Sequence, residues 1–200
     1  MSNVNTVKHF QKLWDKQNGG LCEYYELGMS ALLSINNKNT DKGLIFAKCV
    51  YINSAYSTHI VLSDLRIITD AIFNESDFDN WLYNDPDTTK AVNFIRGIIK
   101  DKDYYSFATK YCALHDGSRF PIRDKLSLKT LKFYQKKGDF CSNKKAFTSD
   151  LKNYKEYIKA YDEFIEFYNL QGLSYREVDK YLWTFSKMPK SESKKHILIK

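Results

Sequence analysis

The 200-residue chain is long enough for one large domain or two small ones with a buried core. Tyr (15) and Phe (13) are abundant, whereas Gly (8) and Pro (3) are scarce, a composition that favours long helices over a turn-rich β fold. The four cysteines lie far apart without a C-x-x-C pair, which excludes the common zinc and iron–sulfur ligand patterns. The sequence has no apolar signal core and no apolar run of membrane length. We therefore expect a reduced, cytoplasmic protein with no metal, no cofactor and no membrane contact.

The net charge of +7 is concentrated in one part of the sequence. The net charge is −2 for residues 1–99, +7 for residues 100–145 and +2 for residues 146–200. A basic segment between nearly neutral flanks is typical of a surface that binds a polyanion. The alternative is a basic region that is merely solvated.

The first half of the chain shows helical spacing of its apolar residues. Short polar residues that favour the N-cap position precede four such stretches, at Thr40-Asp41, Ser63, Ser76 and Asp87-Thr88. We therefore expect four helices between residues 40 and 98.

The next predicted helix begins after Ser106, a suitable N-cap, and ends near His115. Lys110 lies in its middle among apolar neighbours. Burial near apolar groups disfavours the ammonium form, which is one way for a lysine to become an amine nucleophile near neutral pH. The alternative is that Lys110 extends its charged end to solvent from a half-buried helix. For His115 we expect a structural role.

Asp124 follows Pro121-Ile122-Arg123 and is a suitable N-cap for the helix after it. Four lysines of that helix follow the spacing i, i+4, i+7 and i+11, and apolar residues cover most of the remaining circumference. This pattern predicts a largely buried helix with a single row of ammonium groups, which suits a phosphate backbone. The row consists of Lys125, Lys129, Lys132 and Lys136.

The C-terminal part of the sequence predicts two more helices. Apolar residues from Leu151 to Tyr168 step by three and four, which indicates one long amphipathic helix. Ser174 and Glu177 then form the pattern of a capping box before the last helix. Residues 188–200 read as a short charged tail that is frayed unless a partner orders it.

These features predict an all-α protein. We expect one compact multi-helix domain over residues 1–187, in a form that could present two helical lobes flanking a cleft. A soft boundary between the lobes falls near residues 84–104, and residues 188–200 form the tail.

The segment S-F-A-T-K-Y-C…F-P-I-R-D resembles the core of the helix-hairpin-helix GPD superfamily of DNA glycosylases, especially its 8-oxoguanine branch. In that family a hairpin G-x-G-x-K supplies a lysine, and a P-x-D segment follows. Ser106 and Ala108 stand at the two glycines, Lys110 at the lysine and Asp124 at the aspartate. The segments Ile52–Ile60 and Asp179–Trp183 also look like those of a divergent bacterial branch.

The resemblance implies a helical DNA-binding protein with N-glycosylase and abasic-site lyase activity. Lys110 would attack C1′ of a flipped, damaged nucleotide, and Asp124 would stabilise the positive charge that develops on the sugar. Duplex DNA would be the partner, contacted through its phosphates. The residues implied in these contacts are Ser106, Ala108, Arg123, Lys125, Lys129, Lys132 and Lys136.

Two alternatives belong to other functional classes. In the first, the protein is a catalytically inactive nucleic-acid-binding adaptor in which Lys110 packs structurally. In the second, it is a protein-interaction subunit that uses its tyrosine-rich surface and its C-terminal tail. Either could serve a bacterial defence system.

Overall fold

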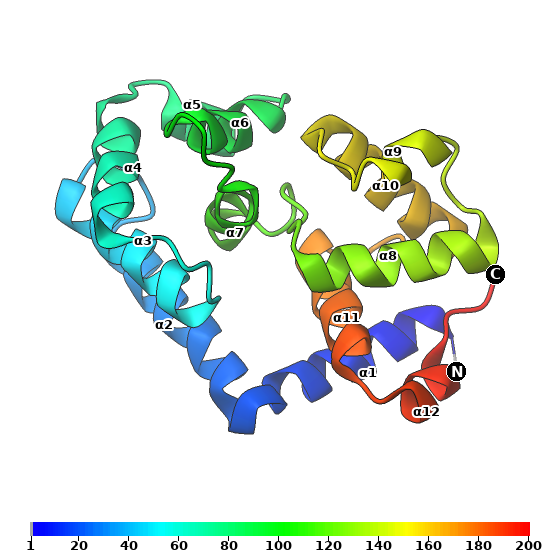
Figure 1. Cartoon of the computed structure of the whole chain (residues 1–200). Helices are drawn as coiled ribbons and strands as arrows, with labels where there is room; N and C mark the ends of the chain where they lie inside the picture. Colours follow the sequence, from blue (N-terminus) through cyan, green and yellow to red (C-terminus); the bar gives the residue numbers. More distant parts are fainter. Residues whose placement is uncertain (1) are drawn as a thin grey trace. The chain divides into compact units, whose positions relative to one another are not determined.

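The computed structural model describes residues 2–200 and, for residue 18, the backbone alone. Every regular element in this range is a helix, which confirms the predicted all-α class (Figure 1). The α-helices are α1 (Asn3–Asp15), α2 (Leu21–Ile35), α3 (Lys42–Ala55), α4 (Leu62–Asn74), α5 (Phe78–Tyr83), α6 (Thr89–Gly97), α7 (Tyr105–His115), α8 (Lys125–Gly138), α9 (Lys144–Thr148), α10 (Tyr154–Phe167), α11 (Tyr175–Lys187) and α12 (Lys190–Ser193). Two 3₁₀ helices, η1 (Gln17–Gly20) and η2 (Lys194–His196), complete the list. No helix in the described range combines the length and the apolar character that crossing a bilayer requires.

The polar residues at the helix starts agree with the sequence in three places. Asp41 caps α3, Asp124 caps α8, and Ser174 and Glu177 form the predicted capping box of α11. In two other places the helix begins earlier than expected. Val61 rather than Ser63 is the N-cap of α4, and Tyr104 rather than Ser106 is that of α7. Neither N-cap residue forms a side-chain capping bond. The start of α7 is buried at Tyr105, whereas Val61 and Leu62 at the start of α4 are 56% and 65% exposed.

The chain divides into two compact units. Unit 1 contains the residues up to Cys22 together with Pro121–Lys200, and unit 2 contains Glu23–Phe120. The segment 84–104, where the sequence suggests a lobe boundary, lies inside unit 2.

Aromatic side chains dominate the core of unit 1. Helix α11 packs against both α1 and α8. Tyr134 of α8 has its ring centroid 5.3 Å from that of Phe164 and 5.0 Å from that of Tyr168, both in edge-to-face contact. Its hydroxyl is hydrogen-bonded to that of Tyr181 in α11. These contacts hold α8, the helix that carries the lysine row, against its neighbours.

The C-terminal residues pack onto unit 1 rather than fraying. Leu198 is buried, and its N–H donates to Tyr134 Oη over 3.0 Å. Ile199 exchanges two hydrogen bonds with the side chain of Asn3, of 2.6 and 3.1 Å. The tail therefore packs against its own chain, because Leu198, an apolar residue among charged ones, is buried in the core of unit 1.

The core of unit 2 combines aliphatic side chains with large buried aromatic ones, among them Phe78, Phe107 and Tyr111. Helix α3 packs against α4 and α7, and α7 packs against α6. Ile45, Ile52, Leu65 and Ile68 are fully buried between α3 and α4. Helix α7, which carries Lys110, is buried along most of its length.

Candidate functional site

Lys110 is a buried lysine that contacts the loop after α3. Only 7% of the residue is exposed. Its Nζ donates to the carbonyl oxygen of Tyr56 over 3.4 Å and lies 5.8 Å from the centroid of the Tyr56 ring. Its charged end therefore does not extend freely into solvent as in a snorkelling lysine.

The side chain of Asn53 forms three hydrogen bonds within the loop that receives Lys110. Asn53 Nδ2 donates to Ile60 O over 2.9 Å, and Asn53 Oδ1 accepts from Ile60 N at 2.8 Å and from Thr58 Oγ1 at 2.7 Å. Ser57 and His59 have φ angles of 48° and 56°, in the left-handed region that costs a non-glycine residue roughly 1 kcal/mol. Two segments that the sequence singles out separately, Ile52–Ile60 and the Lys110 helix, thus adjoin within unit 2.

Ser106 and Ala108 lie within the first turns of a regular helix. Ala108 is fully buried, and its N–H donates to Tyr104 O over 2.9 Å. Its amide is therefore already engaged inside the helix. Ser106 lies in the first turn of α7, where helix geometry offers the N–H no backbone acceptor. Of the two residues, Ser106 is the one whose amide retains the capacity to bind an anion.

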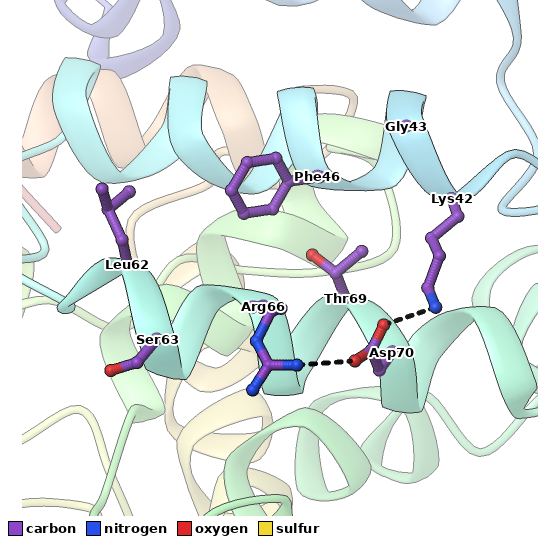
Figure 2. A pocket seen from close by; sticks show the side chains of 8 residues that line it. All are labelled: Lys42, Gly43, Phe46, Leu62, Ser63, Arg66, Thr69 and Asp70. Atoms are coloured by element: carbon purple, nitrogen blue, oxygen red, sulfur yellow. Dashed lines mark ion pairs between the residues drawn. The ribbon is translucent and has the colours of Figure 1, made fainter.

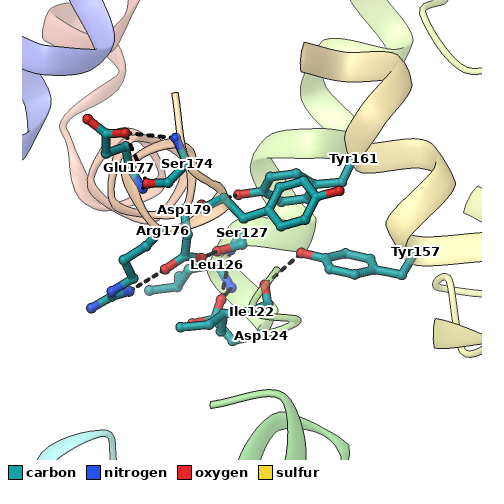
Figure 3. Close-up of polar contacts among 11 residues, drawn as sticks. Ile122, Asp124, Leu126, Ser127, Tyr157, Tyr161, Ser174, Arg176, Glu177 and Asp179 are labelled. Atoms are coloured by element: carbon teal, nitrogen blue, oxygen red, sulfur yellow. Dashed lines mark hydrogen bonds and ion pairs between the residues drawn. The ribbon is translucent and has the colours of Figure 1, made fainter. Parts of the chain in front are cut away.

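Asp124 uses one carboxylate oxygen to cap α8. Its Oδ1 accepts from the N–H of Leu126 at 2.9 Å and of Ser127 at 2.8 Å (Figure 3). Its Oδ2 accepts no hydrogen bond from the described residues, and the residue is 9% exposed. Asp124 therefore combines a structural role with a carboxylate oxygen that remains available.

A second buried carboxylate lies close to this cap. Ser127 Oγ donates to Asp179 Oδ1 over 2.8 Å, and Arg176 donates to Asp179 Oδ2 over 2.6 Å (Figure 3). Ser127 thus contacts Asp124 through its N–H and Asp179 through its hydroxyl. Asp179 begins the Asp179–Trp183 segment, so this segment of the resemblance adjoins Asp124 within unit 1.

Two tyrosines of α10 position the chain just before Asp124. Tyr154 Oη donates to Pro121 O over 3.1 Å, and Tyr157 Oη donates to Ile122 O over 2.7 Å. These bonds satisfy the carbonyls of an extended, buried segment and fix where α8 begins. Arg123 donates to Asp150 O over 2.9 Å.

The predicted lysine row lies on the outer face of α8. Lys125, Lys129 and Lys136 are exposed, and among the described residues none of the three forms an ion pair within 4.0 Å. Lys132 is half-buried and is paired with Asp150, which partly neutralises the row at that point.

The charge of the chain is divided unequally between the two units. Unit 1 carries 21 basic and 11 acidic side chains, a balance of +10, and unit 2 carries 10 and 13, a balance of −3. The basic residues around the lysine row thus belong to a unit that is strongly cationic as a whole.

Lys110 belongs to unit 2 and Asp124 to unit 1. Each is flanked by a segment that the resemblance also contains. The convergence of the amine and the carboxylate on one nucleotide stays a prediction.

The structure also reveals a second buried lysine, Lys48 of α3, that the sequence analysis misses. It is fully buried, and its Nζ donates to Lys38 O over 3.2 Å. Burial lowers the pKa of this amine to about 8, although the nearby carboxylate of Asp79 opposes the shift. The sequence signal, a lysine among apolar residues in mid-helix, is the same as that of Lys110.

His115 takes part in a hydrogen-bonded group near Lys48. Its Nδ1 lies 2.6 Å from Tyr83 Oη, which lies 2.5 Å from Asn37 O. Because the carbonyl can only accept, Tyr83 donates to Asn37 and the Nδ1–H of His115 donates to Tyr83. Its Nε2 is then a bare, buried acceptor without a partner among the described residues. Burial, and secondarily the charge of Lys48, lowers the pKa of His115 to about 3, so the ring is neutral at pH 7.

Two comparisons with known proteins assign the chain to a family. The family model HI_0787_N, described as an N-terminal domain, matches residues 6–119, more than half of the chain. An uncharacterized protein of Haemophilus influenzae is 31% identical over 144 residues, which cover 70% of this chain and 66% of that protein. The chain therefore spans just under two thirds of that relative's length. No solved structure matches the chain. The match over residues 6–119 includes Lys48 and Lys110 but not Asp124, and it shows that the chain belongs to the HI_0787 N-terminal domain family.

Proposed function

We propose that the protein binds duplex DNA through unit 1 and excises a modified base with the amine of Lys110. The observation that carries the DNA-binding part is the charge of unit 1, +10, with three unpaired lysines exposed along α8. Lysines spaced along one helix face can follow a phosphate backbone and release its condensed counterions. Such contacts position a protein on DNA without reading the base sequence.

The proposed chemistry begins at the Lys110 nitrogen. The amine attacks C1′ of a flipped nucleotide, the bond between C1′ and the base breaks, and the base leaves with the bonding electron pair and takes up a proton. The remaining aminal opens to an imine, and elimination of the 3′ phosphate then cuts the strand. The Asp124 carboxylate stabilises the positive charge that develops on the sugar. This mechanism requires Lys110 Nζ and Asp124 Oδ2 to face the same nucleotide.

A catalytically inactive DNA-binding adaptor is the second candidate. It is favoured by the hydrogen bond from Lys110 to Tyr56 O and by the capping role of Asp124, since both residues already have structural partners. In this form the lysine row still binds phosphates and no covalent adduct forms.

The salt dependence of binding tests the DNA-binding part. Replacing Lys125, Lys129 and Lys136 together by alanine should reduce the slope of log K against log salt by about 2.7, because each phosphate contact contributes about 0.9. A matched control replaces three exposed tail lysines, Lys190, Lys194 and Lys195, by alanine. Its slope of log K against log salt should stay close to that of the wild type. Absent binding, or binding that salt does not weaken, would refute the proposal.

Borohydride trapping separates the enzyme from the adaptor. DNA that contains 8-oxoguanine or an abasic site should form a reducible covalent adduct with the wild-type protein and none with Lys110→Ala. The control is Lys48→Met, which removes the other buried amine of unit 2 and should still be trapped. Salt-dependent binding without any adduct would support the adaptor.

A further inference from the structure

Unit 2 exposes an apolar face on α3 and α4 that no part of that unit covers. Between these helices lies an open groove of about 710 Å³ (Figure 2). Leu62 is 65% exposed and Phe73 is 42% exposed, and both belong to α4. Phe46 of α3 turns toward α4 in the groove and is 37% exposed (Figure 2). Exposed apolar groups gathered on one face indicate an interaction surface.

Four residues of α4 form a narrow stripe on this face. Leu62, Arg66, Asp70 and Phe73 follow the spacing i, i+4, i+8 and i+11, so they lie within about 80° of one another around the helix. Their order along the stripe is apolar, positive, negative, apolar. The side chains of Arg66 and Asp70 are 71% and 35% exposed.

This order complements itself when the helix runs antiparallel to a copy of itself. Leu62 then faces the Phe73 of the copy, and Arg66 faces the Asp70 of the copy. The two pairings share a single centre, because the midpoints of Leu62–Phe73 and Arg66–Asp70 are only half a residue apart, less than about 1 Å along the helix. An interface of this kind, in which the same patch serves both partners, is the one that a twofold dimer requires.

The charges around the groove support this arrangement. Lys42 lies 2.7 Å and Arg66 3.9 Å from Asp70 within one chain (Figure 2). Lys42 Nζ also lies 5.6 Å from the centroid of the Phe73 ring. Two cations thus share a single carboxylate, which leaves Arg66 at a loose distance and able to pair across the interface. In the dimer, Arg66 exchanges this loose contact for one with the Asp70 of the second copy, while Lys42 stays paired with the Asp70 of its own chain.

We propose that the stripe Leu62–Arg66–Asp70–Phe73 is a dimer interface, occupied by the same stripe of a second copy of this chain. The two α4 helices cross antiparallel about a twofold axis near residue 68, with Phe46 of each chain at the flank. The contact is small, so the dimer is weak and its population rises with protein concentration.

Sedimentation equilibrium over about 1 to 300 µM protein tests this interface. The apparent mass should rise with concentration from 23.5 kDa toward twice that value. Arg66→Asp and Asp70→Arg should each weaken association at least about tenfold, because each places like charges opposite one another. The double variant Arg66→Asp/Asp70→Arg should restore association, since the pairing is then merely reversed.

Ile67→Asp is the matched control, because Ile67 is also exposed on α4 but lies about 140° around the helix from Leu62. It should leave association unchanged, whereas Leu62→Asp should abolish it. Circular dichroism checks that each variant is folded. A protein that stays monomeric throughout, a double variant that does not recover, or an Ile67→Asp variant that is as impaired as Leu62→Asp would each overturn the proposal.

Discussion

The two roles of Asp124, helix cap and charged group, can be separated by two substitutions. Asp124→Ala removes the oxygen that accepts from the N–H groups of Leu126 and Ser127. Asp124→Asn keeps an oxygen at the same position and removes the negative charge, and asparagine is as good an N-cap as aspartate.

The expected magnitudes follow from the local structure. Loss of an N-cap typically lowers the free energy of unfolding by about 1 kcal/mol, and by up to about 2 kcal/mol in proteins. Ser127 is fully buried, so water cannot replace the lost acceptor at its N–H, and Asp124→Ala should fall at the upper end of this range. Asp124→Asn loses only the interaction of the charge with the helix dipole, about 0.5 kcal/mol.

Urea unfolding of the three proteins measures these differences, and borohydride trapping of the same samples measures the chemistry. If the carboxylate stabilises the sugar cation, Asp124→Asn should lose the adduct while it retains most of its stability. Equal destabilisation by Ala and Asn would refute the assignment of the cap to the side-chain oxygen. An Asn variant that is trapped like the wild type would show that the charge has no part in catalysis.

Three further predictions concern stability. Between pH 6.5 and about 4, the free energy of unfolding should fall by about 1.4 kcal/mol per pH unit, because the unfolded chain binds a proton that native His115, with its pKa near 3, does not. His115→Gln should flatten this dependence, and an unchanged slope would contradict it. Native Lys48 releases its proton near pH 8, whereas the unfolded chain holds that proton up to about pH 10.5. The free energy of unfolding should therefore rise with pH between these values, by up to about 3 kcal/mol. Urea titrations of Lys48→Met should show no such rise. Leu198→Ala should lower the free energy of unfolding by about 3 kcal/mol because it empties a buried site, whereas Ile199→Ala, at a position 75% exposed, should change it little in the same assay.

Local signals predicted local structure well in this chain. The cap at Asp124, the amphipathic helix α10 and the capping box at Ser174 are all read from residues within one or two turns, where the interactions that form them also lie. Ser63 and Ser106 were wrong as caps. Helix α7 begins at the buried Tyr105, where packing outweighs local preference, whereas the residues at the start of α4 are exposed and packing does not explain its earlier start.

The candidate sites depend on contacts that the sequence does not display. A lysine among apolar residues in mid-helix describes both Lys48 and Lys110, yet only the structure shows that one donates to Lys38 O and the other to Tyr56 O. The stripe on α4 has the periodicity of any amphipathic helix. Only the packing of α4 against α3 shows which of its residues are buried and which stay exposed in unit 2.

The sequence by itself determined the all-α class, the starts of α3, α6, α8 and α11, and the row of lysines, because these follow from hydrophobic periodicity, capping preferences and charge within single segments. The tertiary structure alone decided that the residues up to Cys22 join Pro121–Lys200 in one unit, that the C-terminal tail is packed, and that Ser127 contacts Asp179. Such contacts join residues more than fifty positions apart, and they form only when many side chains together bury enough apolar surface to offset the entropy of closing long loops.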